Sequence, residues 1–232
     1  KAMLIDTGFG VGDLKGLVKE IVKDKPLIVA CTHAHYDHAY GNAQFEEIYC
    51  SECEVQRMNA INNDKIWDYL FDENGKPKWT EFDRKDLIKY QPYKIIGVAD
   101  GHRFDLGDGY EVEAVLLPGH TPGQCGYLDL YNMTLFSGDT SGISKAKPGE
   151  LCAENCTVLA SRNAFKKLQP RFKDITGVFP GHGALDVSSV SLQYHLDACE
   201  TILKDPENYD TCKERYMPST NTPRKILMKN IH

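Results

Sequence analysis

The sequence lacks long apolar runs, clusters of basic residues and low-complexity tracts. Its longest apolar stretches, such as Leu27 to Cys31, are far shorter than the roughly 20 residues that a membrane-spanning helix needs. The formal net charge of −6 and the lack of a Lys/Arg run argue against a nucleic-acid partner, because such partners require a basic surface. We therefore expect a protein that acts on small molecules and binds neither membranes nor nucleic acids.

The cysteine content bears on the cellular compartment. Eight cysteines would indicate disulfides in a short secreted chain, but in 232 residues we expect free thiols in a reducing cytoplasm. An alternative is a structural zinc site built from Cys50-x-x-Cys53 and the loosely spaced pair Cys152 and Cys156. No signal peptide is visible. However, Lys1 leads directly into an apolar strand, so we expect that N-terminal sequence is missing, which leaves secretion open.

The order of the predicted elements indicates an α/β fold in one domain over 1–232. An apolar strand at 1–6, a helix that Asp13 caps and a continuous apolar strand at 27–31 form a unit typical of layered α/β proteins. A run of strands follows, and helices then surround one last strand: strands at 93–98, 110–117, 125–130, 133–136 and 176–179, helices at 156–168 and 185–203. We predict two mixed sheets packed face to face, with helices on the outer faces.

The segment at about 58–91 interrupts this order with a helical, aromatic pattern. Trp67, Leu70 and Phe71 fall at i, i+3 and i+4, which places them on one helical face. Because aromatic side chains line many ligand pockets and specificity often lies on loops beside a rigid scaffold, we expect this insertion to form part of a pocket wall. The alternative is that its apolar face is simply buried on the core.

Four side chains that can bind metal occur within six residues, in the motif His33-x-His35-x-Asp37-His38. Imidazole and carboxylate groups suit zinc, iron or manganese. The alternation places His33 and His35 on one side of an extended segment, and the turn that follows can direct Asp37 and His38 toward a second ion. Clustering so many strongly solvated groups after a buried strand does not stabilise a fold, so the motif predicts a metal site.

Three more candidate ligands follow apolar runs and are flanked by glycine. His120 lies in Pro-Gly-His-Thr-Pro-Gly, Asp139 in Ser-Gly-Asp-Thr and His182 in Pro-Gly-His-Gly. The glycines let the backbone approach an ion closely, and a carboxylate such as Asp139 can bridge two ions. His102 and His195 have no such context, and we expect them to be surface or hydrogen-bonded core residues.

Together and in this order, the four segments resemble the metallo-β-lactamase superfamily, over Asp6 to His182. The resemblance implies an αββα sandwich with a dinuclear metal site at one edge, and an early strand before residue 1. It also implies that Asp6 orients a ligand histidine. The implied ligands are His33, His35 and His120 for one ion, Asp37, His38 and His182 for the other, and Asp139 as the bridge.

Two divalent ions, expected to be Zn²⁺ with Fe or Mn as alternatives, lower the pKa of a shared water from about 15.7 toward 7. We therefore predict a hydrolase in which a metal-bridging hydroxide cleaves an ester-like bond (ester, thioester, lactone or phosphodiester), and Asp37 helps to orient the attacking water. Within the family, Asp139 argues against the main zinc β-lactamases, and Gly142 argues against lactonases that carry tyrosine there. The alternative is a one-iron oxidoreductase similar to persulfide dioxygenases. Metal content would discriminate between the two.

Overall fold

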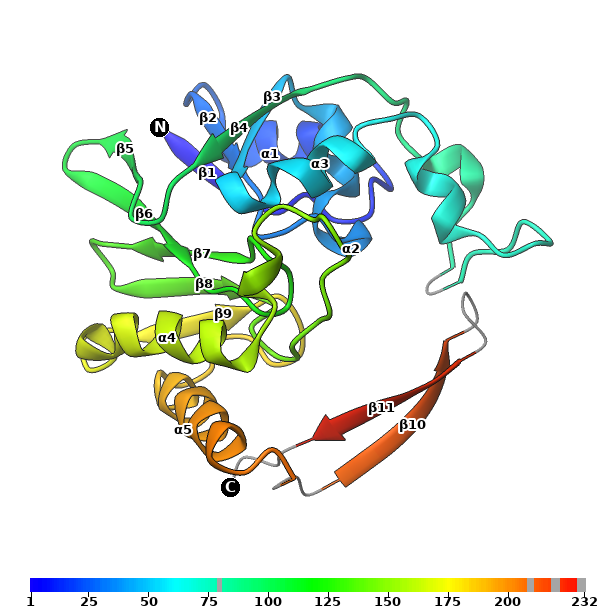
Figure 1. The fold of residues 1–232 in the computed structure, drawn as a ribbon. Coiled ribbons are helices and arrows are strands. Elements are labelled where there is room, and N and C mark those ends of the chain that lie inside the picture. Colours follow the sequence, from blue (N-terminus) through cyan, green and yellow to red (C-terminus); the bar gives the residue numbers. More distant parts are fainter. Residues whose placement is uncertain (79–80, 208–210, 218–221, 229–232) are drawn as a thin grey trace.

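Two β-sheets pack face to face, with helices on both outer sides (Figure 1). The computed structural model describes residues 1–78, 81–207, 211–217 and 222–228. The first sheet has the order β1-β2-β3-β4 and the second the order β5-β6-β7-β8-β9. This arrangement confirms the predicted fold class.

The first sheet is parallel throughout, and the second is antiparallel except for its last pair, β8 and β9. The first sheet consists of β1 (Ala2–Ile5), β2 (Leu27–Ala30), β3 (Glu47–Ser51) and β4 (Lys94–Val98). The second consists of β5 (Arg103–Gly107), β6 (Tyr110–Leu116), β7 (Cys125–Asp129), β8 (Thr134–Gly138) and β9 (Gly177–Pro180). The α-helices are α1 (Leu14–Val22), α2 (Tyr36–Ala39), α3 (Val55–Ile61), α4 (Val158–Leu168) and α5 (Val190–Lys204).

Three apolar clusters fill the spaces between the layers of the sandwich. Tyr127 lies in the cluster between the two sheets. Ile48 and Met58 lie in the cluster between the first sheet and its helices, and Leu135 and Phe165 lie in the corresponding cluster under α4 and α5. Both faces of each sheet are thus covered by apolar side chains. Functional side chains are therefore expected on the loops at the sheet edges.

Two further strands, β10 (Thr211–Met217) and β11 (Thr222–Met228), form an antiparallel hairpin outside both sheets. Among the helices that the structure describes, none is both long enough and apolar enough to span a bilayer.

The segment at 58–91 consists mainly of short 3₁₀ turns and irregular backbone rather than regular helix. Within the turn η3 (Ile66–Leu70), Trp67 is buried in the first-sheet cluster, and its Nε1 donates a hydrogen bond to the Phe9 carbonyl at 3.2 Å. Tyr69 on the same turn is 52% exposed. The turn therefore anchors itself on the core through one side and presents an aromatic ring on the other.

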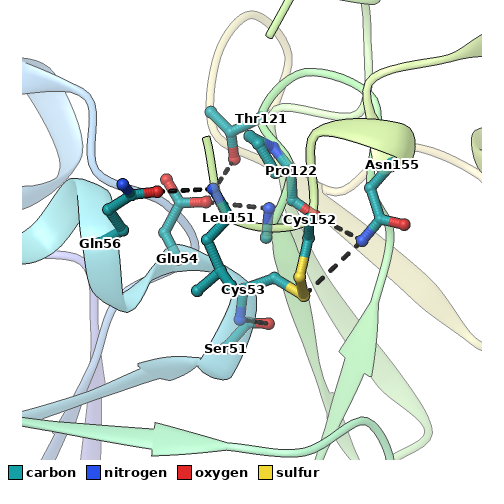
Figure 2. Close-up of a disulfide and its surroundings, with 10 residues drawn as sticks. Ser51, Cys53, Glu54, Gln56, Thr121, Pro122, Leu151, Cys152 and Asn155 are labelled. Atoms are coloured by element: carbon teal, nitrogen blue, oxygen red, sulfur yellow. Dashed lines mark hydrogen bonds between the residues drawn. A yellow bond between two sulfur atoms is a disulfide. The ribbon is translucent and has the colours of Figure 1, made fainter. Parts of the chain in front are cut away.

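The cysteines differ from the sequence-based expectation. Cys53 and Cys152 form a disulfide across 99 positions of sequence (Figure 2), so the prediction of free thiols is wrong for this pair. Cys50 is a buried free thiol, and none of the possible metal-ligand groups found among the described residues contains a cysteine, so the zinc-site alternative is also wrong. The cytoplasmic expectation rested on free thiols and loses that support.

His195 on α5 packs against α4 as a hydrogen-bonded interior residue. Its Nε2 lies 2.9 Å from Ser161 Oγ, and its ring centroid lies 4.0 Å from that of Phe165. Burial lowers the pKa of His195 to about 4. In the unfolded chain the pKa of histidine is near 6.5, so acid protonates the unfolded chain before the folded one. The unfolding free energy is therefore unaffected by His195 above about pH 6.5 and decreases as the pH falls toward about 4.

We expect His195→Gln to make the protein less sensitive to acid. Between pH 7 and pH 4.5 the wild-type protein should lose about 2 kcal/mol more unfolding free energy than the variant, because glutamine does not titrate. Urea unfolding of both proteins at the two pH values measures the difference. Equal losses would show that His195 does not contribute to acid sensitivity.

Candidate metal centre

The candidate ligands all follow strand ends at one edge of the sandwich. The segment from His33 to His38 follows β2, His120 follows β6, Asp139 follows β8 and His182 follows β9. The structure brings all seven predicted side chains together, in three overlapping groups whose ligand atoms lie within 4.8 Å of one another in each group. Both sheets therefore contribute to one site.

His33, His35 and His120 form the first group, and their ring nitrogens face one another. His33 Nε2 and His120 Nε2 each lie 3.0 Å from His35 Nδ1. Burial lowers the pKa of His35 to about 4, and it also lowers the pKa of His33 and of His120. The three imidazoles are therefore neutral at pH 7, which is the form that binds a metal ion.

Asp37, His38 and His182 form the second group. His182 Nε2 lies 3.0 Å from Asp37 Oδ2 and 3.3 Å from His38 Nε2. Burial lowers the pKa of His38, but the carboxylates of Asp139 and Asp6 outweigh burial and raise it to about 10. The two aspartates thus attract positive charge to this position, whether as a proton or as a metal ion.

Asp139 lies between the two groups. Its Oδ2 is 3.4 Å from His120 Nε2 and 3.3 Å from His182 Nε2, and its Oδ1 is 3.4 Å from His38 Nε2. Oδ1 is buried and makes no hydrogen bond within the described part of the chain. A buried anionic oxygen of this kind is costly unless a cation neutralises it. Gly181 permits the close approach, because a Cβ there would overlap Asp139 Oδ1 and the His38 ring.

Asp6 orients two of the histidines. Its Oδ2 lies 2.8 Å from Thr32 Oγ1 and 2.7 Å from His38 Nδ1, and Thr32 Oγ1 lies 3.0 Å from His33 Nδ1. Since an ionised carboxylate only accepts hydrogen bonds, the Thr32 hydroxyl donates to Asp6 and accepts from His33 Nδ1–H. His33 then presents an Nε2 lone pair to the site, and His38 would do the same with a metal ion in place of the proton on its Nε2, as metal ligation requires.

The donor chemistry therefore fits divalent metal ions. Five imidazoles and two carboxylates converge, with two ring tautomers set by Asp6 and with one carboxylate oxygen, Asp139 Oδ1, that accepts no hydrogen bond from the described residues. Imidazole and carboxylate together suit Zn²⁺, and also suit iron or manganese.

A pocket of about 530 Å³ opens beside these groups. Its lining residues are Ala34, His35, Tyr36, Asp37, Tyr40, Tyr69, His120, Asp139 and His182. The Tyr36 ring centroid lies 5.4 Å from that of Tyr69 and 6.3 Å from that of Tyr40, so the three tyrosines form a continuous aromatic wall. Tyr36 lies within the metal motif and Tyr40 lies shortly after it, but the sequence pattern does not identify either of them as a site residue.

The family model for the metallo-beta-lactamase superfamily matches residues 1–207. The chain belongs to the metallo-β-lactamase superfamily. Among solved structures, a beta-lactamase domain protein from Burkholderia ambifaria has a TM-score of 0.57 at 16% identity, over 90% of this chain and 68% of that one. At this identity the likeness shows that the metallo-β-lactamase fold is shared.

Two curated relatives are hydrolases by name. The human acyl-coenzyme A thioesterase MBLAC2 is 29% identical over 153 residues, which cover 59% of this chain and 53% of that protein. A probable polyketide biosynthesis zinc-dependent hydrolase, BaeB of Bacillus velezensis, is 22% identical over 189 residues, or 78% of this chain and 67% of that protein. This chain thus spans only about half the length of the human thioesterase.

Proposed function

We propose that this chain is a two-metal hydrolase, with Zn²⁺ as the expected metal, that cleaves an ester-like bond in a small molecule. The observation that carries the proposal is the position of Asp139 between two ligand groups at an open pocket. His33, His35 and His120 would hold one ion, Asp37, His38 and His182 the other, and Asp139 would contact both. Bound ions of this kind generate a hydroxide nucleophile at neutral pH and polarise the scissile bond.

Asp37 has a second role in this proposal. It lines the pocket, and its Oδ2 lies beside the exposed ring of His182. A carboxylate at the pocket surface can accept a hydrogen bond from the attacking water and so orient it toward the substrate.

The aromatic wall of Tyr36, Tyr40 and Tyr69 supports a substrate with an apolar acyl group. Tyrosine rings offer a large apolar surface with a polar edge, and pockets of this size are commonly lined in this way. A thioester is therefore the preferred substrate class, consistent with the name of the human relative, an acyl-coenzyme A thioesterase. In this proposal the insertion at 58–91 contributes to specificity, through the Tyr69 ring.

Metal analysis followed by a substrate panel tests the proposed function. We expect two zinc ions per chain and the highest turnover on acyl thioesters, compared with lactones, phosphodiesters and β-lactams. Chelation should abolish turnover and added Zn²⁺ should restore it. One iron per chain together with oxygen consumption would reject hydrolysis and favour the oxidoreductase alternative.

The aromatic wall makes a separate prediction for Tyr69→Ala. Loss of the ring should raise KM for the best acyl substrate by about 5- to 10-fold and leave kcat nearly unchanged, because the ring lies in the pocket but is not a ligand. Steady-state kinetics measure both values. Tyr131→Ala is a suitable control, since Tyr131 is an exposed tyrosine outside the pocket. The role of the insertion in specificity is rejected if both variants keep the wild-type KM.

A further inference from the structure

Glu54 is a fully buried carboxylate at the end of the 3₁₀ turn η2 (Glu52–Glu54), directly after β3. Its Oε1 accepts a hydrogen bond from Ala34 N at 3.0 Å. Its Oε2 accepts from Gly123 N at 3.0 Å and from Thr121 Oγ1 at 2.8 Å. Glu54 and Thr121 face each other next to the disulfide in Figure 2. Both carboxylate oxygens are therefore satisfied, by groups from two different loops.

Two of these donors belong to residues that adjoin a candidate metal ligand, and the third, Gly123 N, lies on the same loop as His120. Ala34 separates His33 from His35, and Thr121 directly follows His120. The first of these segments leaves β2 of the first sheet and the second leaves β6 of the second sheet. The Glu54 side chain thus connects one loop of each sheet. These two loops carry all three ligands of the first group.

The local packing shows how closely the second loop rests on Glu54. A Cβ on Gly123 would overlap the Glu54 backbone nitrogen, so the loop lies directly on η2. Asn155 Nδ2 donates to the Pro122 carbonyl at 2.9 Å and holds the loop from its other side. The His120 loop is therefore placed by a small number of specific contacts, and the carboxylate of Glu54 makes two of them.

Stability alone does not explain a carboxylate at this position. Burial raises the pKa of Glu54, and the three hydrogen bonds oppose that effect only in part. The positive charge of Arg57, one turn further along the chain, also opposes the effect of burial, although its guanidinium pairs directly with Glu150. An apolar side chain of similar size would avoid the cost of burying a charge, but it would leave Ala34 N, Gly123 N and the Thr121 hydroxyl without this acceptor. The carboxylate is therefore explained by the donors from two loops that it joins.

We infer that Glu54 is a positioning residue that sets the spacing between the His33–His35 segment and the His120 loop, and so defines the first metal group. The inference rests on the proposed metal centre. Glu54 does not touch substrate or metal in this role. It acts through Ala34 N, which lies between His33 and His35, and through Thr121 Oγ1 and Gly123 N on the loop that carries His120. Glutamine at this position would turn one oxygen into an amide that donates, and one of the two loops would lose its acceptor.

Cobalt substitution tests this role, because the visible absorption of Co²⁺ reports ligand geometry independently of turnover. In Glu54→Gln we expect a Co²⁺ affinity about 10- to 100-fold below that of the wild-type protein, together with a changed Co²⁺ spectrum. Glu113→Gln is the matched control. Glu113 pairs with Arg171 at 2.7 Å outside the metal centre, so its loss should lower the melting temperature and leave the Co²⁺ spectrum unchanged.

The outcomes separate this inference from the proposed function. A wild-type Co²⁺ spectrum and affinity in Glu54→Gln would overturn the inference alone, whereas wild-type protein that binds no Co²⁺ would overturn both. If Glu54→Gln does not fold, Thr121→Val decides, because it removes one donor to the same carboxylate and keeps the side-chain shape. The inference requires a shifted spectrum in Thr121→Val, and an unchanged spectrum would overturn it.

Discussion

Replacing Asp139 with asparagine should reduce turnover on the best substrate by more than about 100-fold and lower the metal content of the purified protein. The two carboxylate oxygens together contact both ligand groups, because Oδ2 lies near His120 and His182 and Oδ1 lies near His38. An amide has one neutral oxygen, and its NH₂ group donates where a cation would bind. Because asparagine and aspartate have nearly the same size, the fold should persist. Kinetics and elemental analysis of the same preparation measure both effects.

Asp105→Asn is the control for the Asp139 variant. Asp105 is an exposed aspartate on β5 that accepts a hydrogen bond from Gly107 N and has no contact with the ligand groups. Its variant should keep wild-type turnover and metal content. If Asp139→Asn also kept two metal ions per chain and near-normal turnover, Asp139 would not be the residue that joins the two sites.

The ligand candidates could be predicted because their chemistry is concentrated in short segments. Four of them lie within six residues, and the glycines around His120 and Asp139 mark positions where the backbone must approach closely. Glu54 could not be predicted in this way. In the sequence it is one of two acidic residues in Glu52-Cys53-Glu54, which is typical of an exposed turn, and its hydrogen-bond partners lie 20, 67 and 69 positions away.

The same limit applies to two strands of the two main sheets that the sequence pattern did not predict, β3 and β5. β3 (Glu47–Ser51) is short and leads directly into helical turns, so its pattern merges with the segment that follows. In β5 (Arg103–Gly107), Phe104 is buried, but charged residues flank it on both sides. Such strands can be recognised only from their hydrogen bonds to strands that are distant in the sequence. β3 is in register with β4, which begins at Lys94, and β5 lies at the edge of the second sheet.

For the segment at 58–91, burial on the core and a place beside the pocket do not exclude each other. The i, i+3, i+4 spacing correctly placed Trp67, Leu70 and Phe71 on the buried side of the segment. Periodicity could not show that Tyr69, between them, turns toward the metal groups, since that depends on how the whole segment lies against the motif. The role of this segment in substrate choice remains the prediction tested by Tyr69→Ala.

Reduction of the Cys53–Cys152 disulfide should lower the unfolding free energy by about 2–4 kcal/mol, because the bond closes a loop of about 100 residues and so restricts the unfolded chain. Cys152→Ser should have the same effect. Cys156→Ser, which removes a nearby free thiol, should leave stability nearly unchanged. Urea unfolding with and without dithiothreitol measures the difference, and peptide mapping without reductant identifies the bond.

The folded geometry around the disulfide has support that does not depend on the bond. Leu151 N donates to Gln56 Oε1, and Asn155 Nδ2 donates to the Pro122 carbonyl, so two hydrogen bonds hold the loop after Asp139 against its neighbours (Figure 2). We therefore expect reduction to lower stability while metal content and turnover at 25 °C stay close to those of the oxidised protein. A loss of metal at unchanged stability would contradict this view, because it would mean that the disulfide acts on the folded site and not on the unfolded chain.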